Sequence, residues 1–482
     1  MGKVTRGAAA YGRRVVLPRS SPAAQGVDSA GLLDLLDRAE RPDHGDGLGL
    51  HSLMVLRHGH VVAEGWWAPY AAARPHLAYS LSKTFTATAV GLLVGEGLLE
   101  LDDPVLSRLP PLPHAPGWEE VRLRHCLSMT VGHDTEAWPR VRPLDGDLLP
   151  GALALPLDHP PGVHFAYNQV ATYLLARVVR HTTGQELSAV LATRLLGPLG
   201  LPTPPWHHDR QGHELGFSGA HVTTETIACL AQLHLDGGRW QGRQLLDPGW
   251  VTEATRGFGP LNTEPDAGPD WRRGYGYSFW QQRHGYRGDG AFGQFLVVLP
   301  EHDAVVATTA ENDRMQETLD ALWTHLVPAL DGRTSPARDR ELARRLARAR
   351  IPAAGGGAGE EVSAPASGSG RLAVGGYDRV QLRGSTLTLH GTAGSHVLDV
   401  GDGGWRETTL TSGARSLPVA ASGGWVGADH YRAVVLLVET PHRFTVDVRR
   451  TATGWAADLQ WRLVPLQGAD PWRTAVRRLP HA

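Results

Sequence analysis

Apolar residues recur at helical spacing in several segments of the first part of the chain. The pattern predicts helices at 29–40, 121–134, 168–182, 221–238 and 316–330, and one that begins at Ser80. The helix that begins at Ser80 carries small and apolar residues on every face, which is typical of a helix buried all round. Gly184 follows the helix at 168–182, where glycine commonly ends a helix.

Continuous apolar runs predict strands near both ends of the same region. Two runs in 50–67 flank His58-Gly59 and predict a hairpin. Within 275–312, the runs YSFWQQ, GQFLVVLP and AVVATTA predict further strands, with a turn at Pro300–Asp303 between the last two. Strands from both ends with helices between them indicate an α+β fold on an antiparallel sheet, rather than alternating βαβ units.

The pattern changes in the last third of the chain. An Arg-rich run at 338–350 predicts a solvated helix face. The Gly-, Ala-, Ser- and Pro-rich segment 351–370 predicts a flexible linker, and short β runs in 371–482 predict a small all-β sandwich or barrel. We therefore expect a first domain at 1–335, a charged helix and linker at 336–370, and a β domain at 371–482.

Length and charge narrow the class of protein. The chain has 482 residues, more than one hydrophobic core usually supports, so two domains are expected. Its 47 Lys and Arg against 49 Asp and Glu give a net charge of −2, which carries no electrostatic signature of nucleic-acid or anionic-membrane binding. The composition resembles that of high-GC bacteria.

Cysteines and apolar runs indicate the compartment. Cys126 and Cys229 are the two cysteines, both within apolar stretches, so we expect small buried hydrophobes rather than a disulfide framework or a Cys-based zinc site. The first twenty residues carry charge but no apolar core of signal-peptide length, and no run is long enough to span a bilayer. We expect a cytoplasmic protein that binds neither nucleic acid nor membrane.

The stretch Ser80-Leu81-Ser82-Lys83 carries candidate chemistry. Residues three apart share one face of a helix, so Ser80 and Lys83 can point the same way. A serine needs a nearby base to become a nucleophile, and a buried lysine can serve because burial disfavours its charged form. The alternative is a capping serine beside a surface lysine, and the spacing alone leaves both open.

Five segments follow one another in a distinctive order within residues 15–330. They are YSLSKTFTATAVGLLVGEGLLELDDPV, VRLRHCLSMTVGHD, PGVHFAYNQVATYLLARVV, GPLGL with HLDGGRWQGRQLLDPGWVTEAT, and RGDGAFGQFLVVLPEHDAVVATTAE. This order resembles the serine β-lactamase and penicillin-binding-protein superfamily, and the resemblance is greatest to class C β-lactamases, family VIII esterases and 6-aminohexanoate-dimer hydrolases.

The resemblance implies roles for individual residues. Ser80 would be the nucleophile, Lys83 its partner, and Tyr167 the tyrosine of the Tyr-x-Asn motif, which acts as acid and base. The backbone N–H groups of Ser80 and Ala291 would form the oxyanion hole. This chemistry is a two-step acyl transfer that needs no metal and no organic cofactor.

Two positions depart from the family pattern. Gln169 stands where the second motif has Asn, and its amide has the same donor and acceptor groups on a longer stem. It can keep a hydrogen bond to Lys83 or to a substrate carbonyl, or it can narrow the pocket. The third motif aligns with Gly288-Asp289-Gly290, without the usual cation; Arg287 and His284 are the candidates for a cation close by. We expect Gln169, Asp289 and Gly290 to contact substrate, and a penicillinase or D-Ala-D-Ala carboxypeptidase is disfavoured.

Other polar and aromatic residues have two interpretations each. His133 and Asp134 either line the mouth of the cleft and bind a polar substrate group, or pair within a loop. Ser82 is a core hydroxyl or a hydrogen-bond relay. Strand packing is expected for Tyr275, Tyr277, Phe279 and Trp280, the alternative being that one of these rings lines the pocket. A solvated loop without metal is expected for His207, His208, Asp209 and His213.

These observations predict a serine hydrolase that cleaves an ester or amide of a small molecule or peptide through an acyl-enzyme at Ser80. An acyltransferase or a peptide-cyclising thioesterase of natural-product metabolism differs in the acceptor alone. A non-catalytic, penicillin-recognising binding protein is the alternative from another class. The C-terminal β domain carries no chemical motif and is expected to be structural or to limit substrate access. The sequence indicates neither the substrate nor an oligomeric state.

Overall fold

The computed structural model describes residues 16–41, 47–357, 359–366 and 370–477. Residues 1–15, most of the N-terminal stretch in which no signal-peptide core was found, lie outside the described residues. The described chain divides into two compact units. The larger unit lies within 14–65 and 77–347, and the smaller unit combines 66–76 with the chain from Arg348 onward.

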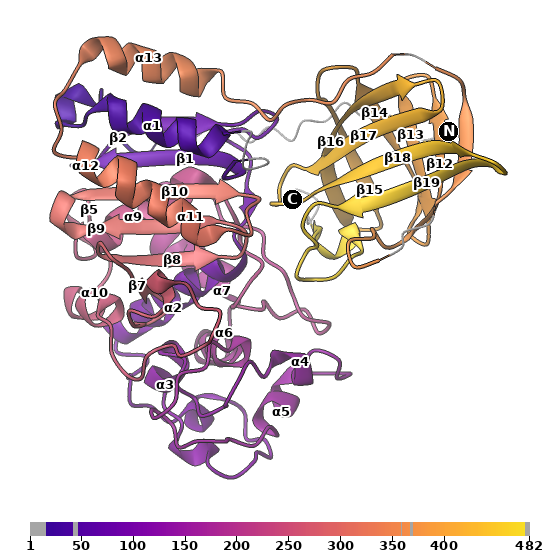
Figure 1. Ribbon diagram of the computed structural model, residues 1–482. Coiled ribbons are helices and arrows are strands. Elements are labelled where there is room, and N and C mark those ends of the chain that lie inside the picture. Colours follow the sequence, from indigo (N-terminus) through magenta and orange to yellow (C-terminus); the bar gives the residue numbers. More distant parts are fainter. Residues whose placement is uncertain (1–15, 42–46, 358, 367–369, 478–482) are drawn as a thin grey trace. The chain divides into compact units, whose positions relative to one another are not determined.

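A six-stranded sheet is the centre of the larger unit as described, in the order β2-β1-β10-β9-β8-β7 (Figure 1). The strands from β1 to β7 in this order pair antiparallel. Their bounds are β1 (Leu50–Arg57), β2 (His60–Trp66), β7 (Trp280–Gln281), β8 (Tyr286–Gly290), β9 (Gln294–Leu299) and β10 (Ala304–Ala310). The antiparallel sheet with strands from both ends of the unit confirms the predicted α+β class.

The strands of this sheet are covered on both faces. Every residue of β1, β9 and β10 is buried, which requires packed layers above and below the sheet. The hairpin between β1 and β2 turns at His58 (φ 49°) and Gly59 (φ 72°), as tight two-residue hairpins require, and the hairpin predicted at 50–67 is confirmed. The strand predicted from YSFWQQ is limited to β7, because Ser278 (φ 61°) turns the backbone just before it.

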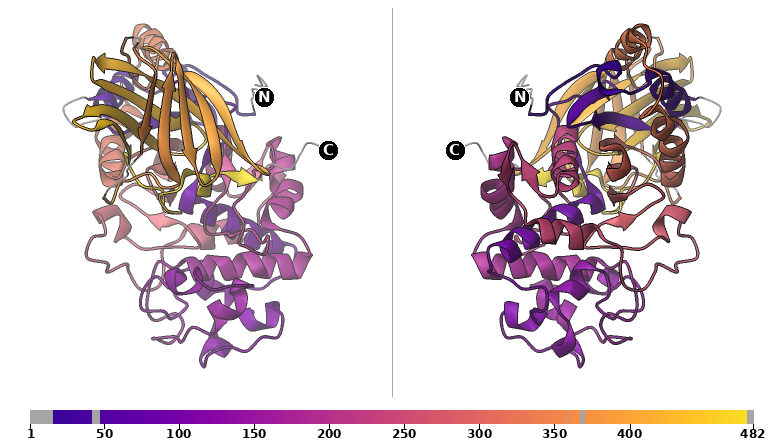
Figure 2. Two further views of the ribbon diagram at one scale, coloured as in Figure 1. Left: turned by 90° about the vertical axis from the view of Figure 1, so that its right-hand side faces the viewer. Right: turned by 90° about the vertical axis from the view of Figure 1, so that its left-hand side faces the viewer.

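Helices form the layers around the sheet (Figures 1 and 2), and each predicted segment contains a helix. The helix predicted at 121–134 is limited to Leu123–Leu127, because Met129 (φ 60°) turns the backbone out of the helix. The longer ones are α1 (Ser29–Glu40), α2 (Ser82–Gly95), α3 (Leu123–Leu127), α4 (Trp138–Val141), α5 (Leu148–Leu153), α6 (Gln169–Thr183), α7 (Leu187–Leu191), α9 (Thr224–Leu235), α10 (Pro248–Thr255), α11 (Met315–Ala321) and α13 (Pro336–Ala347). Short continuations are α8 (Gly197–Leu199) and α12 (Val327–Ala329), each preceded by one π-helical turn. Among the described residues, none of the helices is long and apolar enough to cross a bilayer.

Two helices fix the position of the candidate site. Helix α2 is buried from Ser82 to Leu93 and packs against α6 and β8, in keeping with its apolar surface on every side. Helix α6 begins after Asn168, whose side chain accepts a hydrogen bond from the Val170 N–H at 2.9 Å. Gly184 (φ 70°) ends α6 in the left-handed region, as its position predicted. Cys126 and Cys229 are buried and free.

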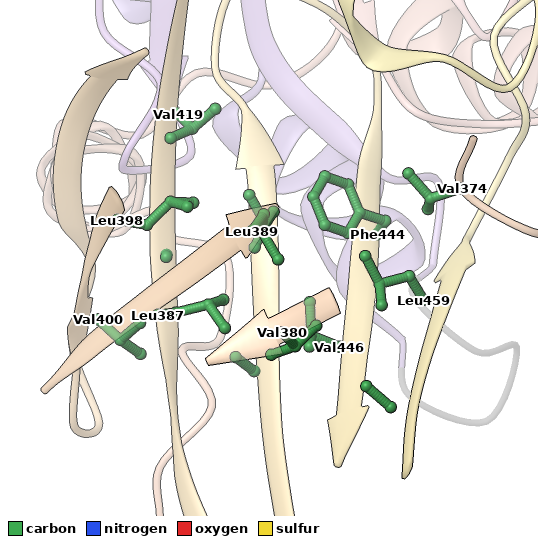
Figure 3. Packing of buried hydrophobic residues seen from close by; sticks show 14 of the residues in the cluster. Val374, Val380, Leu387, Leu389, Leu398, Val400, Val419, Phe444, Val446 and Leu459 are labelled. Atoms are coloured by element: carbon green, nitrogen blue, oxygen red, sulfur yellow. The ribbon is translucent and has the colours of Figure 1, made fainter. Parts of the chain in front are cut away.

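The smaller unit is a curled sheet of strands whose inner face is apolar (Figures 1 and 3). Its strands are β11 (Val362–Pro365), β12 (Tyr377–Arg383), β13 (Thr386–Gly391), β14 (Gly394–Gly401), β15 (Arg406–Ser412), β16 (Arg415–Gly427), β17 (His430–Leu437), β18 (Arg443–Thr451), β19 (Gly454–Trp461) and β20 (Val476–Arg477). The chain just after β11 meets β19 through the bridge Ala366–Ala457, so the first and last strands of the main path approach each other. The all-β nature of this part of the chain is as predicted.

The interior of this sheet is filled with side chains. Alternate residues of β13, β18 and β19 point inward, among them Leu389, Phe444 and Leu459, each at most 2% exposed (Figure 3). The expectation of a flexible linker over 351–370 is wrong in part, because β11 pairs along its length with β12. Residues 358 and 367–369 of that segment lie outside the described residues.

Candidate active site

Ser80 lies in a tight turn that leads directly into α2. The turn is the 3₁₀ helix η3 (Tyr79–Leu81), and its first residue has φ 48°, a conformation that costs a non-glycine residue about 1–3 kcal/mol. The Tyr79 ring is buried and lies edge-on to Phe292 at 5.2 Å, and the Ala78 N–H donates to the Ala220 carbonyl at 2.8 Å. Packing on both sides therefore holds the strained turn and fixes the Ser80 side chain at its surface.

Lys83 is buried one helical turn beyond Ser80. Its Nζ lies 3.1 Å from Ser80 Oγ, 2.6 Å from Gln169 Oε1 and 3.2 Å from the Phe217 carbonyl oxygen. An ammonium group has three N–H donors, so these acceptors satisfy it completely. The side chain is 1% exposed, which excludes the alternative of a surface lysine.

Burial also changes the protonation of Lys83. It lowers the pKa of this amine from 10.5 to about 7, and the charges of Glu136 and Asp289 oppose that change. Near neutral pH the amine is therefore present in both forms. In its neutral form, Nζ can accept the Ser80 hydroxyl proton across the 3.1 Å contact.

Tyr167 lies at the same place, immediately before α6. Its ring centroid is 4.7 Å from Lys83 Nζ, and the Ser80 side chain lies close enough to the phenol to lower its pKa, against the larger effect of burial. The ring stacks on Trp280 at 5.4 Å and meets Tyr275 edge-on at 6.1 Å, so two of the aromatic residues predicted as strand packing form a wall of the site. Burial raises the pKa of Tyr167 well above 10, and the phenol is a proton donor at neutral pH.

Gln169 keeps the hydrogen bond that the family pattern assigns to an asparagine. Its Oε1 accepts from Lys83 Nζ, while its backbone N–H donates to Glu136 Oε1 at 3.1 Å. Gln169 is the first residue of α6, and from this position its longer side chain reaches Lys83. Asn168 points elsewhere: its Nδ2 donates to His133 Nδ1 at 2.8 Å.

The end of β8 lies directly against the serine turn. A Cβ on Gly290 would lie 2.0 Å from the Ala78 carbonyl oxygen and 3.0 Å from the Leu81 nitrogen, so glycine alone permits this approach. Ala291, the residue after Gly290, is held in place because Gln294 Nε2 donates a hydrogen bond to its carbonyl oxygen at 3.0 Å. Gly290 therefore acts through backbone proximity, and Ala291 follows at the position expected of the second oxyanion donor.

Asp289 and Arg287 form a buried ion pair on β8. Arg287 Nε donates to Asp289 Oδ2 at 3.0 Å, and the guanidinium lies over the Trp271 ring at 4.2 Å. The pKa of the Asp289 carboxyl is raised by burial, and the positive charges of Arg287 and Lys83 oppose that rise. Arg287 is fully buried, so it does not replace the missing third-motif cation at the surface of the site. The His284 ring lies tilted against Trp323, with centroids 5.2 Å apart, beyond the opposite end of β8.

His133 and Asp134 have different surroundings. His133 is 2% exposed, meets Trp118 edge-on, and serves to orient Asn168; burial lowers its pKa to about 4. His133 therefore lies in the core rather than at the mouth of a cleft, with Nδ1 bound to Asn168 and Nε2 buried without a hydrogen-bond partner among the described residues. Asp134 is exposed and pairs with His159 at 3.0 Å rather than with its neighbour. Ser82 is a core hydroxyl that accepts from the Ala220 N–H at 3.0 Å.

Glu136 is the residue of the site that no sequence motif indicated. One of its carboxylate oxygens accepts from the backbone N–H groups of Trp138 at 2.8 Å and Gln169 at 3.1 Å. The negative charge of Glu136 raises the pKa of Lys83, and burial raises the pKa of the Glu136 carboxyl itself. Glu136 meets Gln169 across 33 residues of sequence, and the local pattern DTEAW contains no signal for that contact.

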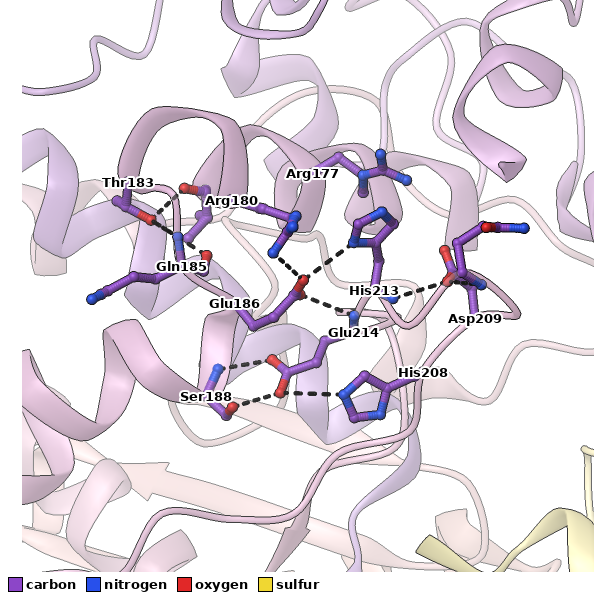
Figure 4. A network of polar contacts seen from close by, with 12 residues as sticks. Arg177, Arg180, Thr183, Gln185, Glu186, Ser188, His208, Asp209, His213 and Glu214 are labelled. Atoms are coloured by element: carbon purple, nitrogen blue, oxygen red, sulfur yellow. Dashed lines mark hydrogen bonds and ion pairs between the residues drawn. The ribbon is translucent and has the colours of Figure 1, made fainter. Parts of the chain in front are cut away.

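The loop that was predicted to be solvated is tied into a polar network (Figure 4). Ser188 Oγ donates to Glu214 Oε1 at 2.5 Å, and His208 Nε2 lies 4.0 Å from the same atom. His213 Nδ1 contacts Glu186 Oε1 at 3.2 Å. Burial raises the pKa of Glu214 to about 7. The loop is therefore packed against the start of α7 and less solvated than expected.

Comparison with known proteins identifies the class that this fold and site define. The Beta-lactamase family model matches residues 37–329, well over half of the chain, and the protein belongs to this family of amide and ester hydrolases. The resemblance predicted from the motifs is confirmed.

Two curated relatives and one solved structure show how far the similarity extends. The 6-aminohexanoate-dimer hydrolase of Paenarthrobacter ureafaciens is 27% identical over 283 residues, which cover 53% of this chain and 71% of the relative. Penicillin-binding protein 4 of Amycolatopsis lactamdurans is 25% identical over 296 residues, 53% of this chain and 77% of the relative. A structure from Bacteroides dorei DSM 17855, proposed to be a beta-lactamase, aligns with 62% of this chain and 99% of its own at 17% identity and TM-score 0.51, which shows the fold.

Proposed function

We propose that the protein is a serine hydrolase that cleaves an ester or amide bond through an acyl-enzyme at Ser80, with Lys83 as the base and Tyr167 as the acid. The observation that carries this proposal is the buried Lys83 amine, 3.1 Å from Ser80 Oγ and with its pKa lowered to about 7. Burial of a charged lysine is costly even where its N–H groups are hydrogen-bonded, which favours a catalytic role over a purely structural one. A catalytic base needs a pKa near the working pH.

The proton path follows from the two pKa shifts. Neutral Lys83 takes the Ser80 proton as Oγ attacks the substrate carbonyl. The Tyr167 phenol, which keeps its proton at neutral pH, gives that proton to the leaving alkoxide or amine, and Lys83 then supplies a proton to the phenolate. In the second step Lys83 and Tyr167 transfer protons in the opposite direction and so activate a water molecule. The water attacks the acyl carbonyl and releases the acid and Ser80.

The oxyanion that forms in each step would lie between the backbone N–H groups of Ser80 and Ala291. The approach of Gly290 to the serine turn supports this placement. Loss of one such donor typically raises the barrier by about 2.7–4 kcal/mol. The substrate is expected to be a small ester, amide or peptide. Arg287 is buried and paired with Asp289, so we do not expect it to bind a substrate carboxylate.

A covalent probe and a substrate screen test the proposal together. A fluorophosphonate should add its mass to the peptide that contains Ser80, and Ser80→Ala should prevent this. The matched control is Ser107→Ala, an exposed serine outside the site, which should label like the wild type. Turnover of p-nitrophenyl esters, nitrocefin and short linear amides identifies the bond that is cleaved. Labelling without turnover of any ester or amide would instead support the penicillin-recognising binding protein.

A further inference from the structure

Three metal-ligating side chains converge outside the catalytic residues. Asp134, His159 and His164 come from two loops of the larger unit, and a donor atom of each lies within 4.8 Å of the other two. His159 Nε2 is 3.0 Å and His164 Nε2 is 3.8 Å from Asp134 Oδ1. The two imidazole rings lie side by side, with centroids 4.4 Å apart and planes 31° from parallel.

The backbone holds these loops together without help from the three side chains. The Gly132 carbonyl oxygen accepts from the N–H groups of Asp158 at 2.8 Å and His159 at 2.9 Å. Asp158 Oδ2 in turn accepts from the Asp134 N–H at 2.9 Å. A Cβ on Gly132 would lie 2.4 Å from the His159 carbonyl oxygen, so the close approach requires glycine. The positions of Asp134 and His159 are therefore fixed before any ligand binds.

The donor set matches a divalent transition metal. Imidazole nitrogen and carboxylate oxygen are ordinary ligands of Zn²⁺, at about 2.0–2.2 Å. Tetrahedral coordination at these bond lengths places two ligand atoms about 3.3 Å apart, and the separations of 3.0 and 3.8 Å from Asp134 Oδ1 bracket that value. All three side chains are partly exposed, which leaves room for a water as fourth ligand.

We propose that Asp134, His159 and His164 bind one zinc ion. His164 also approaches the Asp134 carbonyl oxygen at 3.0 Å, and binding exchanges that contact for the metal bond. The site joins two loops that lead into the catalytic centre, because Glu136 follows one ligand by two residues and Tyr167 follows another by three. Zinc therefore stiffens the segments that carry these two residues. The site does not depend on the chemistry of Ser80.

Isothermal titration of the untagged full-length protein with ZnCl₂ in a non-chelating buffer tests the proposal. We expect one zinc per chain and a dissociation constant in the micromolar range or below. Loss of a residue outside the coordination sphere already weakens metal sites by about 10–100-fold, so His159→Ala/His164→Ala should weaken binding by more than about 100-fold. The control His58→Ala/His60→Ala removes two histidines on the hairpin turn, outside the site, and should bind zinc like the wild type.

Thermal unfolding gives a second measurement. Zinc should raise the melting temperature of the wild type and of Ser80→Ala, but not that of the double variant, which should melt like the metal-free wild type. Asp134→Asn, which keeps the size of the side chain, replaces the double variant if that protein does not fold. The proposal is overturned if the wild type binds no zinc at these concentrations, or if the double variant binds it with unchanged stoichiometry and affinity.

Discussion

The charge of Glu136 should set the pH at which the enzyme becomes active. Its carboxylate lies beside Gln169 N, and Gln169 Oε1 holds Lys83 Nζ at 2.6 Å. The negative charge stabilises protonated Lys83, so Glu136→Gln should lower the pKa of the lysine further. The variant keeps a side-chain oxygen that can accept from Gln169 and Trp138, so its main change is one of charge.

The magnitude follows from the lysine pKa. Its lowering from 10.5 to about 7 corresponds to roughly 5 kcal/mol against the protonated form. A neighbouring opposite charge typically moves a pKa by about 1–3 units, and the low end applies because Glu136 is only partly buried. A fall from about 7 to about 6 would raise the neutral fraction of Lys83 at pH 6 from roughly a tenth to a half, a gain of about fivefold.

The assay is the pH dependence of kcat/KM for a p-nitrophenyl ester, which reports the free enzyme. The activity should rise with pH as Lys83 loses its proton, with a midpoint near 7 in the wild type and about one unit lower in Glu136→Gln. Glu253→Gln, on α10 and paired with Arg256, is the control and should keep the wild-type midpoint. A midpoint in Glu136→Gln that stays in place or rises would refute the reasoning.

Three further substitutions test separate parts of the site. Lys83→Met removes the base and should lower kcat by about 10²–10⁴-fold without loss of folding, as measured by steady-state kinetics and circular dichroism. Tyr167→Phe keeps the stacked ring but not the proton, and should lower kcat by a similar factor with a melting temperature close to the wild type. Gly290→Ala places a Cβ 2.0 Å from the Ala78 carbonyl oxygen, and should lower the free energy of unfolding by about 1–3 kcal/mol and kcat/KM by about 10²-fold. Gly404→Ala, with no atom within 4 Å of the added Cβ, is its control in urea unfolding and in the assay.

The sequence predicted those parts of the structure that depend on local pattern. The buried α2, the end of α6 at Gly184 and the spacing of Ser80 and Lys83 are short-range features, and each is present. The hydrogen bond between Gln169 and Lys83 was one of three possibilities that the residue left open.

Features that depend on distant contacts were not predicted. Glu136 reaches Gln169 across 33 residues, and Asp134 meets His159 across 25, so periodicity carries no information on either. Arg287 could be named as a candidate cation, but its burial against Trp271 follows from the packing of a segment 16 residues earlier. The strand β11 was missed because a Gly- and Ser-rich composition conceals a short run that pairs only when β12 is present.

The central claim is a covalent intermediate on Ser80, and its direct test is peptide mass spectrometry after acid quench of a reaction with a p-nitrophenyl ester. We predict the acyl mass on the peptide that contains Ser80 in the wild type, slower formation in Lys83→Met, and no acylation in Ser80→Ala. Turnover that persists in Ser80→Ala, or an acyl group found on another residue while Ser80 stays unmodified, would contradict the account.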